Sequence, residues 1–156
     1  MYYALFQSPV GQLTLVASDA GLRAILWPAE KPGRVKLPEI ISGEHAVLQA
    51  TTAQLTEYFA GERREFDLPL DLHGTPFQVK VWRSLADILY GTTASYAEQA
   101  DRLGAPKAVR AVGSANGRNP ISIVLPCHRV VASNGSLAGF AGGLDAKRWL
   151  LDFESR

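Results

Sequence analysis

At residues 95–117 the chain has the sequence SYAEQADRLGAPKAVRAVGSANG. Its first part, Ser95–Leu103, has a helical apolar pattern that ends at Gly104-Ala105-Pro106. The second part is helical again from about Pro106 to Ala115 and ends at Asn116-Gly117. Two short helices joined by a tight turn that contains glycine are typical of a helix-turn-helix, and we expect that motif here.

The second helix of this pair consists mostly of small residues, with one long side chain, Arg110, projecting from among them. The small residues are Ala108, Ala111, Gly113, Ser114 and Ala115. Small residues let a helix backbone approach a binding partner closely. They are also common where a helix packs tightly against its own neighbour, and the spacing alone fits both interpretations.

Further helices are predicted on either side of this motif. Thr75-Pro76-Phe77-Gln78 combines a threonine N-cap, a proline at the first helical position and a capping-box glutamine. The helix continues to Gly91 through the apolar positions Val79, Trp82, Leu85, Ala86 and Leu89. Asp145–Glu154 predicts a terminal helix, and Asp71-Leu72-His73-Gly74 is a plausible linker. We therefore expect a mainly helical domain at residues 73–156.

The first half of the chain has the alternating pattern of strands. Prolines and glycines mark residues 28–43 as a loop, and Glu44–Ala60 has helical spacing that ends at Gly61. The predicted strands, of which the first three form a meander, are residues 2–7, 12–18, 22–27 and 66–72. We expect an α+β protein with a small sheet-plus-helix domain at residues 1–72 before the helical domain.

Positive charge is concentrated in the second half. The whole chain has 16 basic and 15 acidic residues, and this balance gives no indication of a nucleic-acid partner. Residues 1–101 carry eight basic and twelve acidic residues, whereas residues 102–156 carry eight basic and three acidic ones. Between Arg102 and Arg129 there are five basic residues and no acidic one. Such asymmetry suggests a polyanionic partner, although a solvated basic face has the same composition.

The composition excludes several classes of protein. A chain of 156 residues with 47% hydrophobic and 20% charged residues can form a packed core. The single cysteine excludes an intrachain disulfide and a Cys-rich zinc site, and we expect no metal. No apolar run approaches the ~20 residues of a membrane helix, and the N-terminus lacks a signal-peptide pattern. We expect a soluble, cytoplasmic protein.

The single cysteine lies in Pro126-Cys127-His128-Arg129. A free thiol is only roughly 3% thiolate at pH 7, so a nucleophilic role needs a nearby base or positive charge. His128 and Arg129 could provide these, with His128 as the base, and Glu154 is a candidate carboxylate to orient it. Adjacent side chains of an extended chain point to opposite faces, so His128 would need a turn or a bridging water. A lone cysteine can equally be a small buried hydrophobe.

The cysteine follows the small-residue helix closely in the sequence. Asn119-Pro120 comes after that helix, and the apolar residues Ile121–Leu125 predict a strand that leads to Cys127. A nucleophile would then lie where a nucleic acid binds. Beyond it, the glycine-rich residues 139–143 fit either a pocket wall that offers backbone N–H groups or a plain loop.

Together these motifs resemble the O6-alkylguanine-DNA alkyltransferases, also called methylated-DNA–protein-cysteine methyltransferases. The most specific match is Pro126-Cys127-His128-Arg129-Val130. The other matching segments are Thr75-Pro76-Phe77-Gln78, Val81-Trp82, Tyr90-Gly91, Ser95-Tyr96, Arg110-Ala111-Val112-Gly113, Asn119-Pro120-Ile121, Gly142-Gly143-Leu144, Lys147, Trp149-Leu150-Leu151 and Glu154. The resemblance covers about half of the chain closely and the N-terminal half loosely.

The resemblance implies an RNase H-like N-terminal sheet domain and a C-terminal domain that binds DNA. The second helix of the helix-turn-helix would enter the minor groove, and Arg110 would fill the space left by a flipped base. The other implied DNA-binding positions are Ala108, Ala111, Gly113, Ser114, Ser95 and Arg118.

The resemblance also implies catalytic roles. Cys127, His128 and Glu154 match a Cys–water–His–Glu relay. Tyr96 matches a tyrosine that hydrogen-bonds the guanine ring, and Asn119 matches an asparagine that braces the turn before the active site.

The implied substrate pocket contains Val130, Phe140, Ala141 and Gly142, and the sequence departs from the family near it. Phe140 stands where the family usually has tyrosine, and Ala141 where some members have serine. Leu89 replaces the usual proline before Tyr90-Gly91. These departures put the size of the pocket and its preference among alkyl groups in doubt, but they leave the nucleophile in place.

The implied function is DNA repair. The protein would flip O6-alkylguanine, mainly O6-methylguanine, out of double-stranded DNA and transfer the alkyl group irreversibly to Cys127. We expect one turnover per molecule, no cofactor and a monomer. One alternative is a non-catalytic module that binds alkyl lesions, although such relatives replace the cysteine. A cysteine hydrolase is the other, and it does not explain Arg110.

Overall fold

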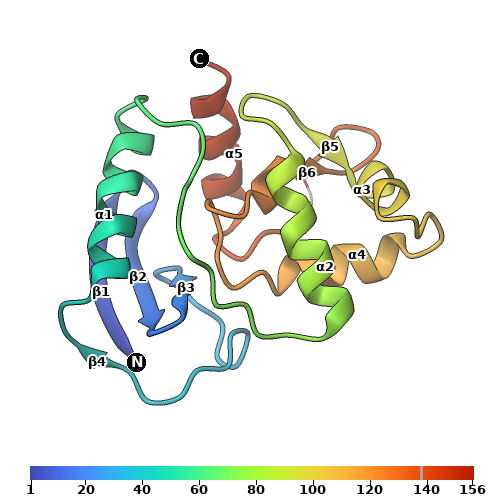
Figure 1. Ribbon diagram of the computed structural model, residues 1–156. Helices are drawn as coiled ribbons and strands as arrows, with labels where there is room; N and C mark the ends of the chain where they lie inside the picture. Colours follow the sequence, from blue (N-terminus) through green and yellow to red (C-terminus); the bar gives the residue numbers. More distant parts are fainter. Residues whose placement is uncertain (138) are drawn as a thin grey trace. The chain divides into compact units, whose positions relative to one another are not determined.

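The computed structural model describes residues 1–137 and 139–156. The chain divides into two compact units, Met1–His73 and Gly74–Arg156. The first is built around a sheet and the second around helices, as Figure 1 shows. The expected α+β class is confirmed.

The sheet of the first unit begins with the meander that the sequence predicts. Its strands pair antiparallel in chain order: β1 (Tyr2–Ser8), β2 (Gly11–Ser18) and β3 (Gly21–Leu26). A short strand, β4 (Ile41–Ser42), pairs in parallel with β1 and gives the order β3-β2-β1-β4. It lies within residues 28–43, which the sequence predicted to be a loop. So short a strand has no side-chain periodicity from which it could have been predicted.

The helix of this unit, α1 (Ala46–Phe59), lies against the sheet. His45 caps its start, since the Nδ1 atom of His45 accepts a hydrogen bond from the backbone N–H of Val47 at 3.1 Å. Gly61 follows its end with φ +79°, a left-handed conformation that commonly ends a helix. The helix predicted at Glu44–Ala60 is therefore confirmed, slightly shortened by its caps.

The strand predicted at residues 66–72 is wrong. In the described part of the chain the backbone of this segment pairs with the sheet only in an isolated parallel bridge between Leu70 and Leu22. The backbone N–H of Leu22 donates to the carbonyl of Pro69, and that of Asp71 donates to the carbonyl of Leu22, both at 2.8 Å. Pro69 has no N–H to extend the ladder, so regular pairing does not develop.

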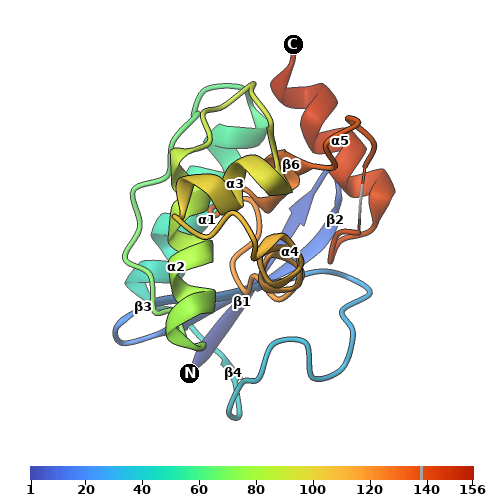
Figure 2. The ribbon, with the colours of Figure 1, turned by 90° about the vertical axis from the view of Figure 1, so that its right-hand side faces the viewer.

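The second unit has four α-helices in its described residues: α2 (Pro76–Ser84), α3 (Tyr96–Arg102), α4 (Val109–Gly117) and α5 (Leu144–Glu154). The first three lie side by side in both views (Figures 1 and 2). They share a small apolar core formed by Val81, Ala100, Val112 and Ala115.

The start of α2 follows the sequence, but its end does not. Thr75 and Gln78 form the predicted capping box, with hydrogen bonds of 3.0 and 3.1 Å. The α-helix ends at Ser84 and tightens into a single 3-10 turn, instead of continuing to Gly91. Ile88 is already extended, and its carbonyl accepts a hydrogen bond from the side chain of Arg129.

The predicted helix-turn-helix is confirmed. A capping box formed by Ser95 and Glu98 begins α3. Gly104, with φ +73°, turns the chain after it. The second helix, α4, begins at Val109, later than the sequence predicts, because residues 105–108 form a turn of their own.

Two buried hydrogen bonds fix α4 against the other helices. The indole Nε1 of Trp82 donates to the carbonyl of Ala115 at 2.7 Å. The side-chain amide of Asn116 donates to that of Gln99, also at 2.7 Å. Since buried polar groups are costly to leave unpaired, these bonds hold α4 in one position and determine which of its faces stays exposed.

Candidate active site

The loop that leads to Cys127 is organised by the side chain of Asn119. Its Nδ2 donates to the carbonyl of Leu125 at 2.8 Å, and its Oδ1 accepts from the backbone N–H of Ile121 at 3.0 Å. Ile123 adopts a left-handed backbone, φ 73°, at the tip. The strand predicted at Ile121–Leu125 is wrong, because the buried amide satisfies backbone groups that a neighbouring strand would otherwise pair.

Cys127 begins a short turn. Residues Cys127–Arg129 form a single 3-10 turn in which the backbone N–H of Arg129 donates to the carbonyl of Pro126 at 3.0 Å. The side chains of Cys127 and His128 are buried, with relative exposures of 6% and 0%. The chain is therefore not extended here. A turn was one of the two arrangements, the other being a bridging water, that would let His128 accept the thiol proton.

The carboxylate of Glu154 holds both residues that follow the cysteine. His128 Nε2 lies 2.8 Å from Glu154 Oε2. Arg129 donates to the same carboxylate through Nε at 2.8 Å and Nη2 at 3.0 Å, while its Nη1 donates to the carbonyl of Ile88 at 2.7 Å. Glu154 thus ties the cysteine turn to α5, Arg129 ties it to Ile88 just after the 3-10 turn that follows α2, and all three side chains are buried.

The environment of His128 favours its neutral form. Burial lowers the pKa of His128 most strongly, and the charges of Arg129 and Lys147 lower it further, while Glu154 opposes them. The Nδ1 atom is buried and has no hydrogen-bond partner among residues 1–137 and 139–156. Because Nε2 faces a carboxylate, the neutral ring has its N–H there, and Nδ1 is the basic nitrogen.

A buried lysine adds a positive charge to this centre. Lys147 has no exposed surface, and its Nζ donates to the carbonyl of Val130 at 2.7 Å. The same ammonium lies 5.9 Å from the centre of the Tyr96 ring. Burial lowers the pKa of Lys147, whereas the charge of the Cys127 thiolate raises it. Burial, and to a smaller extent the same negative charge, raises the pKa of Tyr96.

Tyr96 joins the cysteine turn to the helix-turn-helix. The short strand before it, β5 (Ala94–Ser95), pairs in parallel with β6 (Val130–Val131), which follows the turn. Gly113 of α4 lies against the Tyr96 ring, so that a Cβ atom at Gly113 would be 3.8 Å from its nearest carbon. The structure therefore brings together five predicted site residues, namely Tyr96, Gly113, Cys127, His128 and Val130, and adds Glu154 through His128.

The predicted DNA-binding residues occupy α4 and its ends, except for Ser95, which is the N-cap of α3. Arg110, Ala111 and Ser114 are exposed on one side of the helix, and Arg118 is exposed at its C-cap. Ala108 and Gly113 are half-buried, and the Ser95 hydroxyl is engaged in capping α3. The small residues of α4 are divided between two environments, since Ala115 packs inside while Ala111 faces solvent.

Arg129 corrects one inference from the charge pattern. It is one of the five basic residues between positions 102 and 129, but it is only 5% exposed and is paired with Glu154. The exposed members are Arg102, Lys107, Arg110 and Arg118. The basic surface is therefore smaller than the count suggests.

The remaining predicted pocket residues precede α5. Phe140, Ala141 and Gly142 are half-buried, and the backbone N–H of Gly143 donates to the carbonyl of Phe140 at 3.0 Å. This turn leads into α5, which carries Lys147 and Glu154. The three predicted pocket residues therefore lie in the segment just before α5, the helix that supplies two of the charged side chains of the centre.

Two residues contribute to the centre in ways that the sequence did not predict: Arg129, expected only as a positive charge near the thiol, is the partner of Glu154, and Lys147, expected only as a match to the family, is buried beside it. A signal for the lysine exists, because α5 buries one stripe of residues, and two charged residues fall on it. The buried residues of α5 are Ala146, Lys147, Leu150 and Glu154. Charged residues on a buried stripe are almost always paired, so both were candidates for a polar centre.

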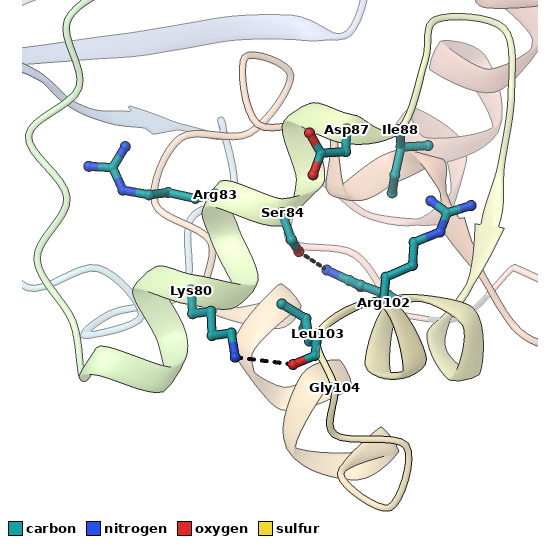
Figure 3. A pocket seen from close by; sticks show the side chains of 9 residues that line it. Lys80, Arg83, Ser84, Asp87, Ile88, Arg102, Leu103 and Gly104 are labelled. Carbon is teal, nitrogen blue, oxygen red and sulfur yellow. Dashed lines mark hydrogen bonds between the residues drawn. The ribbon is translucent and has the colours of Figure 1, made fainter.

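A separate cavity lies between α2 and α3 (Figure 3). It has a volume of about 540 Å³ and contains none of the predicted site residues. Lys80 spans its edge by donating to the carbonyl of Leu103 at 3.1 Å. The lining residues are Lys80, Arg83, Ser84, Asp87, Ile88, Gln99, Arg102, Leu103 and Gly104.

The described residues hold no group of three or more side chains that could bind a metal ion. In the same residues, no helix is long and apolar enough to cross a membrane.

A sheet unit followed by a helix-turn-helix unit with a buried Cys–His–Glu centre defines the class of this protein. Residues 1–72 match the 6-O-methylguanine DNA methyltransferase ribonuclease-like domain, and residues 76–156 match the DNA binding domain of the same enzymes. The chain belongs to the 6-O-methylguanine DNA methyltransferase family.

Curated relatives and solved structures agree. The chain is 45% identical to a methylated-DNA–protein-cysteine methyltransferase of Methanosarcina acetivorans, over 99% of this chain and 98% of that protein. It is 46% identical to one of Mycolicibacterium paratuberculosis, over 99% and 92%. A crystal structure of Mycobacterium tuberculosis OGT in complex with DNA superposes with a TM-score of 0.89 at 44% identity, covering 99% of this chain and 93% of that one.

Proposed function

We propose that this protein repairs double-stranded DNA by transferring the alkyl group of O6-alkylguanine, mainly methyl, to its own Cys127. The observation that carries the proposal is the buried turn of Cys127 and His128, held by Glu154 in a unit that also contains a helix-turn-helix. Relatives that share the whole length of the chain are named for this reaction. Residues 73–156 act as the DNA-binding and alkyl-accepting domain.

His128 activates the nucleophile in this proposal. A water molecule next to Nδ1 relays the thiol proton of Cys127 to that nitrogen, while Glu154 at Nε2 stabilises the imidazolium that forms. The low pKa of His128 keeps Nδ1 unprotonated at neutral pH before the reaction. Asn119 fixes the loop before the cysteine, which keeps Sγ in position for attack.

The transfer itself is a displacement at the alkyl carbon. The bond between Sγ and that carbon forms as the bond from carbon to O6 breaks, and the electron pair of the broken bond stays on the purine. The purine then takes up a proton, so that thiol and O6-methylguanine become a methyl thioether and guanine. Tyr96 donates toward ring N3, and backbone N–H groups near Ala141 face O6, where they stabilise the departing purine. The carbonyl groups of Cys127 and Val130 accept from the exocyclic amine.

Helix α4 presents the DNA-binding surface. Its exposed small residues, Ala111 and Ser114, allow the helix to approach the minor groove closely, and Arg110 enters the space left by the flipped base. Base flipping costs a few kcal/mol, which contacts of exposed basic residues with backbone phosphates offset. The thioether is stable, so each molecule reacts once, as a monomer and without a cofactor. The reduced thiol that this needs suits the cytoplasm.

Intact mass spectrometry tests the proposal. The protein is incubated with an excess of duplex DNA that contains one O6-methylguanine, and its mass is then measured. We expect a gain of one methyl group that saturates at one equivalent and maps to Cys127. The Cys127→Ser variant serves as the matched control and stays unmodified. Binding without modification would support the lesion-binding module instead, and product release by unmodified protein would support a hydrolase.

A further inference from the structure

The loop before the cysteine contains a strained residue, Ile123. Its φ is 73°, and among the residues that the structure describes it is the only one other than glycine with a positive φ. A side chain branched at Cβ is poorly suited to this region, because Cβ there crowds the backbone. Glycine would adopt the same conformation without strain. The presence of a bulky isoleucine at this point therefore needs an explanation.

The strain lies in a γ-turn. The backbone N–H of Val124 donates to the carbonyl of Ser122 at 2.9 Å, and this bond closes a three-residue turn around Ile123. A γ-turn with positive φ at its centre is the rare and strained form, whereas the inverse form with negative φ is common. Strained backbone persists only where the surrounding structure holds it, and it is concentrated at functional sites.

Further turns connect the strained residue to the cysteine. The backbone N–H of Leu125 donates to the carbonyl of Ile121 at 3.0 Å, in a wider turn that encloses the γ-turn. The carbonyl of Leu125 accepts two hydrogen bonds of 2.8 Å, one from Asn119 Nδ2 and one from the backbone N–H of Cys127. The second of these closes an inverse γ-turn, with φ −82° and ψ 67° at its central residue. The position of Cys127 therefore depends directly on the conformation around Ile123.

The side chain of Ile123 supplies the anchor for this conformation. It is only 1% exposed, and Ile121 and Leu125 on either side of it are also buried. Burying an isoleucine completely stabilises a protein by about as much as one strained residue destabilises it. The burial of Ile123 thus offsets the strain in its own backbone. A glycine would remove the strain, but it would remove the anchor as well.

We infer that Ile123 is a positioning residue for the transfer, whose buried side chain holds the strained turn that fixes the place of Cys127 Sγ. Displacement at the alkyl carbon requires the thiol to be held in line with it, and a misplacement of about 1 Å can slow such a reaction by roughly 100-fold. A loop held in one conformation keeps Sγ at the reactive position. The consequence for transfer rests on the proposed function, whereas the strain itself can be measured without DNA.

Thermal unfolding tests the strain. Ile123→Gly and Ile123→Ala both lose the buried side chain, but only glycine adopts a positive φ freely. We therefore expect Ile123→Gly to melt at or above the temperature of Ile123→Ala. The control pair is at Ile25, an equally buried isoleucine in β3. There the glycine variant should melt about 2 °C below the alanine variant, because glycine weakens a regular strand.

Single-turnover methyl transfer tests the positioning, at saturating duplex DNA and at a temperature where every variant is folded. Ile123→Ala and Ile123→Gly should react about tenfold more slowly, with the half-saturating DNA concentration unchanged. The loss should be equal on the free O6-alkylguanine base, because the thiol itself is misplaced. Ile123→Val keeps a buried β-branched side chain and should react within about twofold of the native rate. Ile25→Ala, which also loses a buried side chain, should react at the native rate.

Two results would overturn the inference. One is a native rate of transfer to the folded Ile123→Ala and Ile123→Gly proteins, or a rate for Ile123→Val as low as theirs, which would leave Ile123 a purely structural residue. The other is an Ile123→Gly protein that melts below Ile123→Ala as the pair at Ile25 does, which would show that the turn is not strained.

Hydrogen exchange of the native protein decides the question if the alanine and glycine variants do not fold. The backbone N–H groups of Val124 and Cys127 should exchange as slowly as that of Leu150, which is buried in α5. Fast exchange there would show that the loop opens by itself and would contradict the inference. Failure of the proposed function would look different: the unfolding comparison would come out as expected, while the native protein gained no mass from O6-methylguanine DNA.

Discussion

The exposed face of α4 and the buried centre around Glu154 are built on opposite principles. The α4 face offers small side chains and a single long arginine, Arg110, all of them exposed to solvent. The centre packs four charged or titratable side chains into nearly complete burial, namely His128, Arg129, Lys147 and Glu154. The α4 face is free to contact an outside partner, whereas each charged group of the buried centre depends on the others. Single substitutions in the buried centre should therefore have the larger effects on stability and activity.

The largest effect is expected for Glu154→Gln. This change leaves Arg129 buried without its carboxylate and removes the group that orients His128. Removing one partner of a buried ion pair typically lowers the free energy of unfolding by about 3–5 kcal/mol, and methyl transfer should nearly stop. Chemical denaturation and the mass assay measure the two losses. Asp152→Asn, on the exposed side of the same helix, is the control and should change neither.

A smaller and more selective effect is expected for Arg110→Ala. The residue is exposed, so stability should stay within about 0.5 kcal/mol of the native value. Reaction with duplex DNA should slow by roughly 10–100-fold, because flipping costs a few kcal/mol. Reaction with the free O6-alkylguanine base should be almost unchanged. Equal losses on both substrates, in single-turnover kinetics, would exclude a role in flipping.

The pH dependence of the reaction should reflect the burial of His128. A histidine whose pKa is lowered stays neutral to lower pH, so the transfer rate should stay level from about pH 8 to 6.5 and fall only below that range. Stability should fall in the same direction. The unfolded chain takes up a proton at His128 near pH 6.5, which the folded protein resists, and unfolding is therefore favoured as the pH drops. Rate and unfolding measurements across this range test both statements.

The smallest effect is expected for Gly113→Ala. Gly113 lies inside α4, and an added Cβ would be in ordinary contact with the Tyr96 ring, at 3.8 Å. Alanine favours a helix over glycine by up to about 1 kcal/mol, so the melting temperature should rise slightly. If Gly113 lies at the DNA surface as proposed, affinity for duplex DNA should fall while stability increases. A loss of stability would show that Tyr96 has no room to adjust.

The comparison also explains what the sequence could predict. The capping boxes at Thr75 and Ser95 depend on residues three positions apart, so the helix starts of the second unit were foreseeable. The expected strands at residues 66–72 and 121–125 depended on long-range partners. In the first segment, Pro69 lacks the N–H that would extend the pairing. In the second, the side chain of Asn119 bonds to the backbone in place of a neighbouring strand.

The buried centre was foreseeable only in part. His128 and Glu154 were expected to meet because the family motif links them, and their atoms are 2.8 Å apart. The bonding partners of Arg129 and Lys147 could not be predicted from spacing, since each partner lies far along the chain, although the buried stripe of α5 marks Lys147 as a residue that needs one. Arg129 bonds to Ile88, and Lys147 bonds to Val130. Charge counting also treated Arg129 as part of the surface, because a sequence does not show which charges are buried.

The hydrogen bond from Trp82 to Ala115 should influence the fluorescence of the protein. Indole emission depends on the polarity and hydrogen bonding of its surroundings, and Trp82 is buried with its Nε1 bound to the backbone of α4. The other two tryptophans, Trp27 and Trp149, lie outside this contact. If both are replaced by phenylalanine, the remaining fluorescence comes from Trp82 alone. Its emission then reports whether α4 stays packed against Trp82 when the protein binds DNA.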